Sequence, residues 1–190
     1  VKKCCLKLGR QRKPPRTMRL LPRFLSQKHC ENIVKNAEKS SVGSTERLTT
    51  LVEASGPEDG QNYENTISDL RITERLNVGN QQDKLNALVA QLFQSNLKFF
   101  GKKGLGVIER ADVMRYKVGG LYKAHSDSEA FDKKHGRWQK ILNRDLSLLV
   151  YLNENFKGGG IRFTHFDFEY QPRTGDAIVF PSNHLHLHEV

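Results

Sequence analysis

Apolar residues recur at helical spacing in two stretches of the N-terminal half of the chain. The first is 21–40, where Ser26 is suited to cap the N-terminus of a helix. Its apolar stripe consists of Leu25, Cys30, Ile33, Val34 and Ala37. The second is 81–101, which Gly101 can end. Its apolar stripe consists of Leu85, Leu88, Val89, Leu92, Phe93 and Leu97. The pattern therefore predicts two amphipathic helices.

The second half of the chain has the short apolar patterns of strands. Residues 41–66 are rich in Ser, Thr, Gly, Asn and Glu, which predicts a long loop with a short strand at 48–52. Further strands are expected at 107–119, 146–153, 161–166, 167–172 and 176–181. Two helices followed by many short strands indicate an α+β fold, with helices packed on antiparallel sheets arranged as a barrel or jelly roll.

Composition limits the class of protein. The chain has 190 residues, of which 37% are hydrophobic, so one domain with a sizeable core is expected. No apolar run approaches the ~20 residues of a membrane span. The odd number of cysteines cannot form a disulfide framework, which favours a reducing intracellular compartment. These cysteines are Cys4, Cys5 and Cys30.

The net charge of +10 is concentrated at the N-terminus. Residues 1–24 hold nine Lys and Arg and no acid, whereas the remainder has 22 basic and 21 acidic residues. We therefore expect a basic extension at 1–24 and a nearly neutral domain at 25–190. Such an extension can bind polyanions, direct targeting or simply be solvated. No RNA-binding motif with interleaved aromatic residues is present, so a nucleic-acid partner is the least favoured of these readings.

The sequence YKAHSD contains a candidate pair of metal ligands. In an extended segment, His125 and Asp127 project to one face and Ser126 points away. This spacing alone is also typical of a solvated polar pair. Near the C-terminus, His184, His186 and His188 alternate and would share one face of a strand, so any of them could add a further ligand. Two histidines and one carboxylate form the ligand set of non-haem Fe(II) oxygenases and leave three coordination positions open.

Three stretches together resemble successive motifs of the 2-oxoglutarate and Fe(II)-dependent dioxygenases of the prolyl 4-hydroxylase type. They are YKVGGLYKAHSD, RDLSLLVYLNENFKGGGIRF and PRTGDAIVFPSNHLHLHEV, and the resemblance covers roughly 105–190. The helix with FLSQKHCENIV is similar to an N-terminal helix of that family. The resemblance implies a double-stranded β-helix, or jelly roll, with N-terminal helices packed on one sheet.

The resemblance also implies roles for individual residues. His125 and Asp127 match two metal ligands and His188 matches the third, with His186 as the alternative and His184 as a rim residue. The residues expected to line the cosubstrate pocket are Tyr116, Tyr122, Ser147, Leu149 and Tyr151.

The implied activity is hydroxylation of a peptidyl residue, with proline as the first candidate. The cofactors would be Fe(II), 2-oxoglutarate and O2, with ascorbate as reductant and succinate as a product. The partner would be a protein or peptide substrate, and the pattern does not determine the oligomeric state. The segment 128–145, with Trp138, is either a substrate lid or a surface excursion.

The chain departs from the family pattern at its end. Family members carry a basic residue about ten positions after the distal histidine, which pairs with a carboxylate of 2-oxoglutarate. This sequence stops at Val190, so we expect that the last strand is missing and that the chain is truncated. Arg144 and Arg162 are the basic residues nearest the motif strands. The alternative is a truncated or degenerate, non-catalytic jelly roll that still binds metal.

Overall fold

The computed structural model describes residues 13–43, 45–53, 63–67 and 69–190. The helices are α1 (Gln27–Ser40), η1 (Gly79–Gln81), α2 (Gln82–Asn96), η2 (Thr164–Phe166) and η3 (His184–His186). The strands of the first half are β1 (Arg19–Leu21), β2 (Glu46–Arg47), β3 (Thr50–Glu53), β4 (Tyr63–Thr66), β5 (Arg71–Ile72), β6 (Glu74–Leu76) and β7 (Val113–Arg115). The later strands are β8 (Leu121–Tyr122), β9 (Glu129–Asp132), β10 (Arg137–Lys140), β11 (Leu146–Val150), β12 (Ile161–Phe163), β13 (Phe168–Tyr170), β14 (Ala177–Pro181) and β15 (His188–Glu189).

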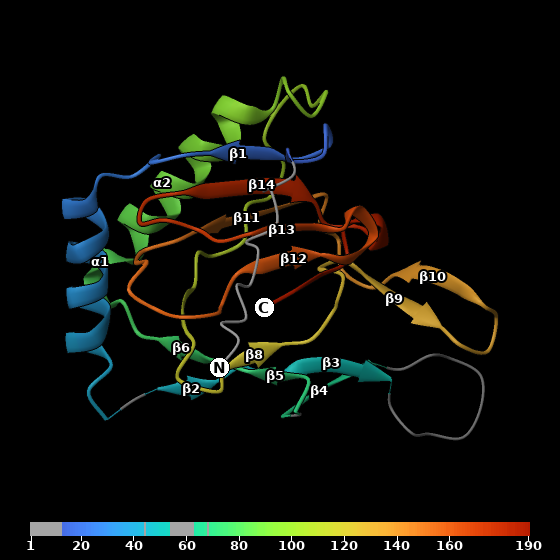
Figure 1. Cartoon of the computed structure of the whole chain (residues 1–190), viewed down its shortest axis with the longest axis horizontal. Helices are drawn as coiled ribbons and strands as arrows, with labels where there is room; N and C mark the ends of the chain where they lie inside the picture. The colour runs from blue at the N-terminus through green and yellow to red at the C-terminus, as the bar shows by residue number, and fades with distance from the viewer. Residues whose placement is uncertain (1–12, 44, 54–62, 68) are drawn as a thin grey trace, which may run out of the picture.

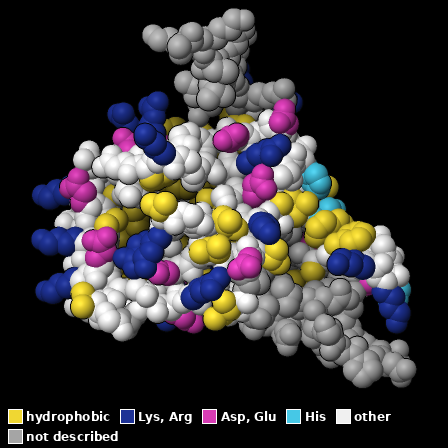
Figure 2. All heavy atoms as spheres, turned by 60° about the horizontal axis from the view of Figure 1, so that its bottom comes forward, with side chains coloured by type: hydrophobic (Ala, Val, Ile, Leu, Met, Phe, Trp, Pro, Cys, Tyr) yellow, Lys and Arg dark blue, Asp and Glu magenta, His cyan; other side chains and the backbone are white. Residues whose placement is uncertain are grey.

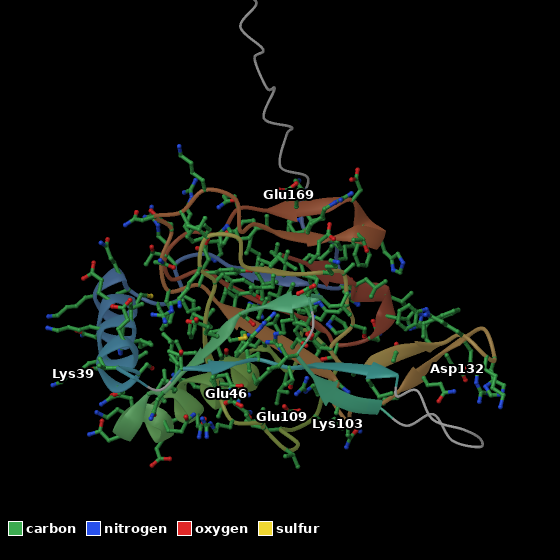
Figure 3. All side chains as sticks on the ribbon, turned by 90° about the horizontal axis from the view of Figure 1, so that it is seen from below. Lys39, Glu46, Lys103, Glu109, Asp132 and Glu169 are labelled. Atoms are coloured by element: carbon green, nitrogen blue, oxygen red, sulfur yellow. The ribbon has the colours of Figure 1, made fainter. Side chains whose placement is uncertain are left out.

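All strand pairs are antiparallel, and the largest sheets bring distant parts of the chain together. One sheet has the order β1-β14-β11, a second β13-β12-β15 and a third β2-β6-β7, while β5 pairs with β8. In Figure 1 the strand β14 lies between β1 and β11, and the β9–β10 hairpin projects from the side opposite α1. Figure 3 shows the same separation, with Lys39 on α1 and Asp132 on the hairpin at opposite ends.

The core lies between the sheets and under the helices. Phe163 and Phe180 are fully buried in one apolar cluster with Ile161, Ile178 and Tyr170. A second cluster joins α2 to the β14 sheet, where Leu92 packs with Ala177 and Val179. A third joins α1 and α2 to β6 and β7 and contains Ala37, Leu76, Val78, Leu85 and Val113. Side chains alternate between the two faces along β12 and β13, so the first and last residues of each strand are buried and the middle residue faces solvent.

Most expected elements exist, but several boundaries differ. Ser26 caps α1 by accepting a hydrogen bond from the backbone N–H of His29 at 3.3 Å. The helix α2 ends at Asn96, before Gly101, because residues 97–101 continue as turns. The predicted loop at 41–66 contains β2, β3 and β4, although its residues 44 and 54–62 lie outside the described part. The predicted strand at 107–119 is reduced to β7, since the residues before Val113 do not pair with a neighbouring strand.

The structure also describes two further segments about which the sequence raised expectations. The segment 128–145 forms the β9–β10 hairpin, in which Trp138 packs edge-to-face on Phe131 and stacks on His184. Met18 is 3% exposed and β1 pairs with β14, so the folded part extends at least to Met18, within the expected basic extension. Residues 1–12 of that extension lie outside the described part.

The described surface has no single dominant sign of charge on the face drawn in Figure 2, where Lys and Arg side chains lie beside Asp and Glu. Both long helices of the described part are too short to cross a membrane, and neither has a suitably apolar stretch.

Candidate metal centre

Backbone pairing places the two histidine-bearing segments side by side. His125 and His188 form an isolated antiparallel bridge, with N–H to O distances of 3.0 and 3.1 Å in the two directions. The same pairing continues to Tyr122 and Val190, which also exchange backbone hydrogen bonds. On its other side, His188 pairs with Phe163 of β12. The C-terminal segment is therefore paired with a neighbouring segment on each side. The two histidines lie side by side, although 62 residues separate them in the sequence.

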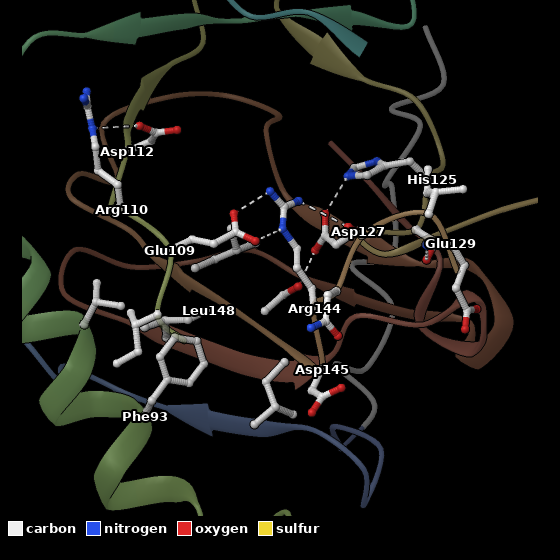
Figure 4. Close-up of a pocket in the computed structure, with 18 of the residues that line it drawn as sticks. Phe93, Glu109, Arg110, Asp112, His125, Asp127, Glu129, Arg144, Asp145 and Leu148 are labelled. Carbon is white, nitrogen blue, oxygen red and sulfur yellow. Dashed lines mark hydrogen bonds and ion pairs between the residues drawn. The ribbon is translucent and has the colours of Figure 1, made fainter. Parts of the chain in front are cut away.

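Three side chains converge at this bridge. One ligand atom from each of His125, Asp127 and His188 lies within 4.8 Å of the others. The Nε2 atom of His125 is 3.5 Å from Asp127 Oδ1, and Nε2 of His188 is 3.8 Å from Oδ2. Figure 4 shows the His125 ring pointing toward the Asp127 carboxylate. The structure thus brings together the three residues that the sequence nominated as metal ligands.

The other nitrogen of each imidazole is occupied by the backbone. Nδ1 of His125 lies 2.8 Å from the carbonyl oxygen of Lys123, and Nδ1 of His188 lies 3.0 Å from that of His186. A carbonyl oxygen can only accept, so each Nδ1 carries the proton and each neutral ring has a lone pair on Nε2. Backbone hydrogen bonds of this kind orient imidazoles for metal coordination.

A set of serines holds the Asp127 carboxylate. Ser147 on β11 donates from Oγ to Asp127 Oδ2 at 2.6 Å, and its Oγ lies 2.7 Å from Oγ of Ser182. The Ser182 carbonyl accepts from Ser126 Oγ at 2.8 Å and Ser128 Oγ at 2.9 Å. These contacts fasten the turn after His125 to the end of β14. Ser147, which we expected in the cosubstrate pocket, lines the cavity beside the triad and also holds the carboxylate. Ser182, in the sequence FPS, was not nominated.

The protonation states suit metal binding. Burial alone would raise the pKa of Asp127, but its interactions with the His125, His188 and Ser147 side chains outweigh burial and hold this pKa below its usual range. Burial lowers the pKa of His188 to about 4, although the Asp127 charge opposes this shift. At neutral pH the carboxylate is therefore ionised and the His188 ring is neutral, as coordination requires.

Aromatic rings enclose the two imidazoles. Tyr122 stacks on His125 with ring centroids 3.4 Å apart and an interplanar angle of 14°. Phe163 and Phe180 lie 5.5 and 4.9 Å from the His188 ring, which is 4% exposed as a residue. These contacts restrict rotation of both imidazoles and limit access of water to one side of the triad.

The remaining residues expected to bind cosubstrate lie in two environments. The Tyr151 hydroxyl is buried and has no hydrogen-bond partner among the described residues. Leu149 packs against the apolar cluster around Phe163. Tyr116 is partly buried, with 36% of its surface exposed, and the loss of solvent around it raises its pKa to about 12. Burial also raises the pKa of Tyr151 well above its usual value. Both phenols therefore remain hydrogen-bond donors at neutral pH.

His184 and His186 do not join the triad. We expected both on one strand with His188, but they belong to η3, and the strand begins only at His188. His184 Nδ1 lies 2.5 Å from Glu129 Oε2. The two nitrogens of His186 lie 2.8 Å from Asn183 Oδ1 and 2.9 Å from Thr17 Oγ1. The 3-10 turn breaks the two-residue alternation, so the three rings point to different surroundings.

The cavity beside the triad has a volume of about 800 Å³. Its walls include Tyr122, His125, Asp127, Ser147 and Leu149, and Figure 4 shows Arg144 within it. This volume is near the upper end of that of ordinary small-molecule pockets.

The two arginines nearest the motif strands differ in position. Arg144 donates to the backbone oxygen of Asp127 at 3.2 Å and binds both oxygens of Glu109 at 2.6 Å. Arg162 is exposed on β12 and pairs with Glu189 at 3.3 Å. Only Arg144 of these two lies at the cavity.

Comparisons with known proteins agree with this geometry. Residues 111–190 match the family model of the 2OG-Fe(II) oxygenase superfamily. Over 126 residues the chain is 27% identical to a protein of Acanthamoeba polyphaga mimivirus named "Putative prolyl 4-hydroxylase". That match covers 64% of this chain and 49% of the relative, so the chain spans about half the length of the curated relative it matches.

Solved structures of prolyl hydroxylases have the same fold. One from Trichoplax adhaerens, in complex with a peptide fragment of the hypoxia inducible factor oxygen degradation domain, gives a TM-score of 0.65 at 16% identity, covering 92% of this chain and 77% of that chain. A Pseudomonas putida prolyl-4-hydroxylase gives 0.58 at 19% identity, covering 92% and 84%. The α+β jelly-roll class expected from the sequence is thereby confirmed.

Proposed function

We propose, from the match of residues 111–190 to the family model of the 2OG-Fe(II) oxygenase superfamily, that the protein is an Fe(II)- and 2-oxoglutarate-dependent dioxygenase of the prolyl 4-hydroxylase type. The proposed reaction hydroxylates a peptidyl residue, with proline as the first candidate, and converts 2-oxoglutarate to succinate. The observation that carries the proposal is the convergence of His125, Asp127 and His188 at the His125–His188 bridge.

The donor set fits Fe(II). Two imidazoles whose Nδ1 atoms lie against backbone carbonyls turn Nε2 toward the site, and one ionised carboxylate offsets part of the metal charge. This is the two-histidine, one-carboxylate arrangement that leaves coordination positions free for further ligands. We assign His125, Asp127 and His188 as the metal ligands. Ser147 keeps the carboxylate in place through its hydrogen bond to Oδ2.

One buried hydroxyl has no hydrogen-bond partner among the residues that the structure describes, which favours a ligand rich in oxygen atoms beside it. We assign the Tyr151 hydroxyl to donate to a carboxylate of 2-oxoglutarate, because an unpaired buried hydroxyl is costly until a ligand satisfies it. Tyr116 can supply a second phenolic donor, and Leu149 an apolar wall. Tyr122 positions His125 by stacking on its ring.

When bound, Fe(II), 2-oxoglutarate and O2 supply oxidative decarboxylation coupled to substrate hydroxylation, with ascorbate as the expected reductant. The protein's own residues orient the ligands and exclude water. Phe163 and Phe180 close the inner side of the His188 ring. The open cavity then leaves the outer side for a peptide segment.

The direct test is turnover of candidate proline-containing peptides, followed by succinate formation and by the mass of the product. The wild-type protein should form succinate and a product heavier by one oxygen atom. His125→Ala and Asp127→Ala should lose turnover together with Fe(II) binding. The matched control is His29→Ala, which removes an exposed histidine on α1 far from the triad's chain segments. Unchanged metal binding in both triad variants would overturn the proposal.

A further inference from the structure

Arg71 lies one aromatic ring away from the metal triad. It is on β5, where it is the direct pairing partner of Tyr122 on β8. Its guanidinium carbon is 4.5 Å from the centroid of the Tyr122 ring, and that ring lies 3.4 Å from the His125 ring. The guanidinium is therefore no more than about 8 Å from the imidazole, a span of two to three extended residues.

Within the described residues, the side-chain hydrogen bonds of Arg71 all go to uncharged groups. Nε donates to Thr73 Oγ1 at 3.1 Å, Nη1 to the Thr49 carbonyl at 3.4 Å and Nη2 to Met114 Sδ at 3.1 Å. The Tyr122 ring adds a cation–π contact. A thioether sulfur is a weak hydrogen-bond acceptor, so Nη2 of Arg71 has only a weak partner in Met114.

The other arginines of the same cavity wall each have a carboxylate. Arg75 binds Glu46 at 2.8 Å and Asp112 at 3.0 Å. Arg144 binds Glu109, and Arg110 lies 3.9 Å from Asp112; Figure 4 shows both of these pairs. Among the arginines of this wall, Arg71 is thus the one that has no carboxylate partner in the part of the chain that the structure describes.

The surroundings of Arg71 are apolar and accessible. Leu70, Ile72 and Met114 are 40%, 37% and 36% exposed, and Tyr116 is 36% exposed. Among these, Leu70 and Met114 line the same cavity as Arg71. A ligand here would meet apolar contacts and one guanidinium. The Tyr151 hydroxyl assigned to 2-oxoglutarate is buried instead, whereas Arg71 lines the cavity wall.

We propose that Arg71 binds an acidic side chain of the peptide substrate, two to three residues from the residue that is hydroxylated. The inference rests on the proposed function and adds a specificity-determining residue to it. A carboxylate of the substrate could accept two hydrogen bonds from the planar guanidinium of Arg71, which has no acidic partner among the described residues.

The test uses short peptides with a central proline in which one flanking position at a time is varied. Hydroxylation of each peptide is measured by mass with Fe(II) and 2-oxoglutarate. The wild type should prefer Asp or Glu over Asn or Gln at one flanking position by about tenfold. R71Q should lose this preference, and R71E should prefer Lys or Arg there. The control R110Q removes a guanidinium that already has a carboxylate, and should keep the wild-type preference.

Binding of 2-oxoglutarate without peptide separates the outcomes. Because Arg71 contacts the buried Thr73, thermal unfolding first establishes that the variants fold, and R71K provides a milder change. The proposal requires unchanged affinity for 2-oxoglutarate in R71Q. A weaker affinity would assign Arg71 to the cosubstrate and overturn the proposal, as would an acidic preference that persists in R71Q or is absent from the wild type. Hydroxylation of no peptide by protein that binds Fe(II) and 2-oxoglutarate would instead overturn the proposed peptidyl activity.

Discussion

His186 and His188 lie two residues apart, are both nearly inaccessible and yet have different surroundings. His188 begins β15, where Nδ1 contacts a backbone carbonyl and Nε2 faces Asp127 across 3.8 Å. His186 ends η3, where both ring nitrogens have hydroxyl or amide partners from Thr17 and Asn183. Burial lowers the pKa of both rings to about 4, so burial alone does not distinguish a ligand from a structural histidine.

The difference lies in which nitrogen is left free and what it faces. A backbone carbonyl at Nδ1 fixes the tautomer and leaves a lone pair on Nε2, while a nearby carboxylate supplies a negative ligand. In His186 both ring nitrogens have partners, so the ring connects η3 to the segment before β1 and leaves no nitrogen for a metal. We therefore expect substitution of His188 to lower mainly the metal affinity, and substitution of His186 to lower mainly the stability of the fold.

The largest predicted effect is on Fe(II) affinity. His188→Ala should weaken binding by at least about a hundredfold, because one of three protein ligands is lost. His186→Ala should retain Fe(II) affinity within a few-fold and should unfold more easily. Anaerobic equilibrium binding and thermal unfolding of both variants measure these quantities. Equal loss of metal affinity in the two variants would remove the distinction between the histidines.

A smaller loss is expected from the support of the carboxylate. Ser147→Ala removes the 2.6 Å hydrogen bond to Asp127 Oδ2 and should weaken Fe(II) binding by about tenfold. Ser126→Ala is the matched control, since its hydroxyl donates to the Ser182 backbone rather than to the carboxylate. If both serine variants bind Fe(II) as the wild type does, the serine contacts do not position the ligand.

Two tyrosines extend the comparison between ligand-binding and structural groups. Tyr151→Phe should raise the free energy of unfolding of the apo protein, because it removes a buried hydroxyl that has no partner among the described residues, but should lower 2-oxoglutarate affinity about fivefold. Tyr170→Phe should reduce the free energy of unfolding by about 1–2 kcal/mol, since its hydroxyl donates to buried Asp176. Isothermal titration and denaturant unfolding test the pair. If Tyr170→Phe lowered the affinity for 2-oxoglutarate and Tyr151→Phe lowered the stability, the roles of the two hydroxyls would be exchanged.

The final predicted effect, which is spread over more than two units of pH, is the pH dependence of stability at His186. Its pKa is about 4 in the folded protein and about 6.5 when unfolded, so the unfolded chain binds a proton first. The free energy of unfolding should therefore fall as pH drops from about 6.5 to 4, by at most about 1.4 kcal/mol per unit from this residue. In His186→Gln this contribution should disappear, while that of His188 remains. The free energy of unfolding in urea is measured as a function of pH for the wild type and for His186→Gln. If it changes equally with pH in the two proteins, His186 makes no such contribution.

The sequence predicted the fold class because its local signals agree with the folded arrangement. Ser26 caps α1, and the apolar runs of β11 and β14 are buried or half-buried strands. The two-residue spacing of His125 and Asp127 also identified a convergent pair. The alternation of the C-terminal histidines was misleading, because the backbone enters a 3-10 turn at His184 and becomes a strand only at His188.

Other features depend on contacts between distant segments. The hydroxyl of Ser147 reaches Asp127 because β11 pairs with β14, which brings Ser182 beside it. Likewise, Arg71 contacts Tyr122 only through the pairing of β5 with β8. The periodicity of either segment alone does not specify its partner strand. The FPS motif was the one local signal that could have indicated Ser182.

The central claim is that His125, Asp127 and His188 hold an iron to which 2-oxoglutarate can bind. The most direct measurement is an anaerobic absorption titration of the Fe(II)-loaded protein with 2-oxoglutarate. The account predicts a visible charge-transfer band that saturates with 2-oxoglutarate, persists in His186→Ala and is absent from His188→Ala. A band that persists unchanged in His188→Ala, or that never forms in the wild type, would contradict it.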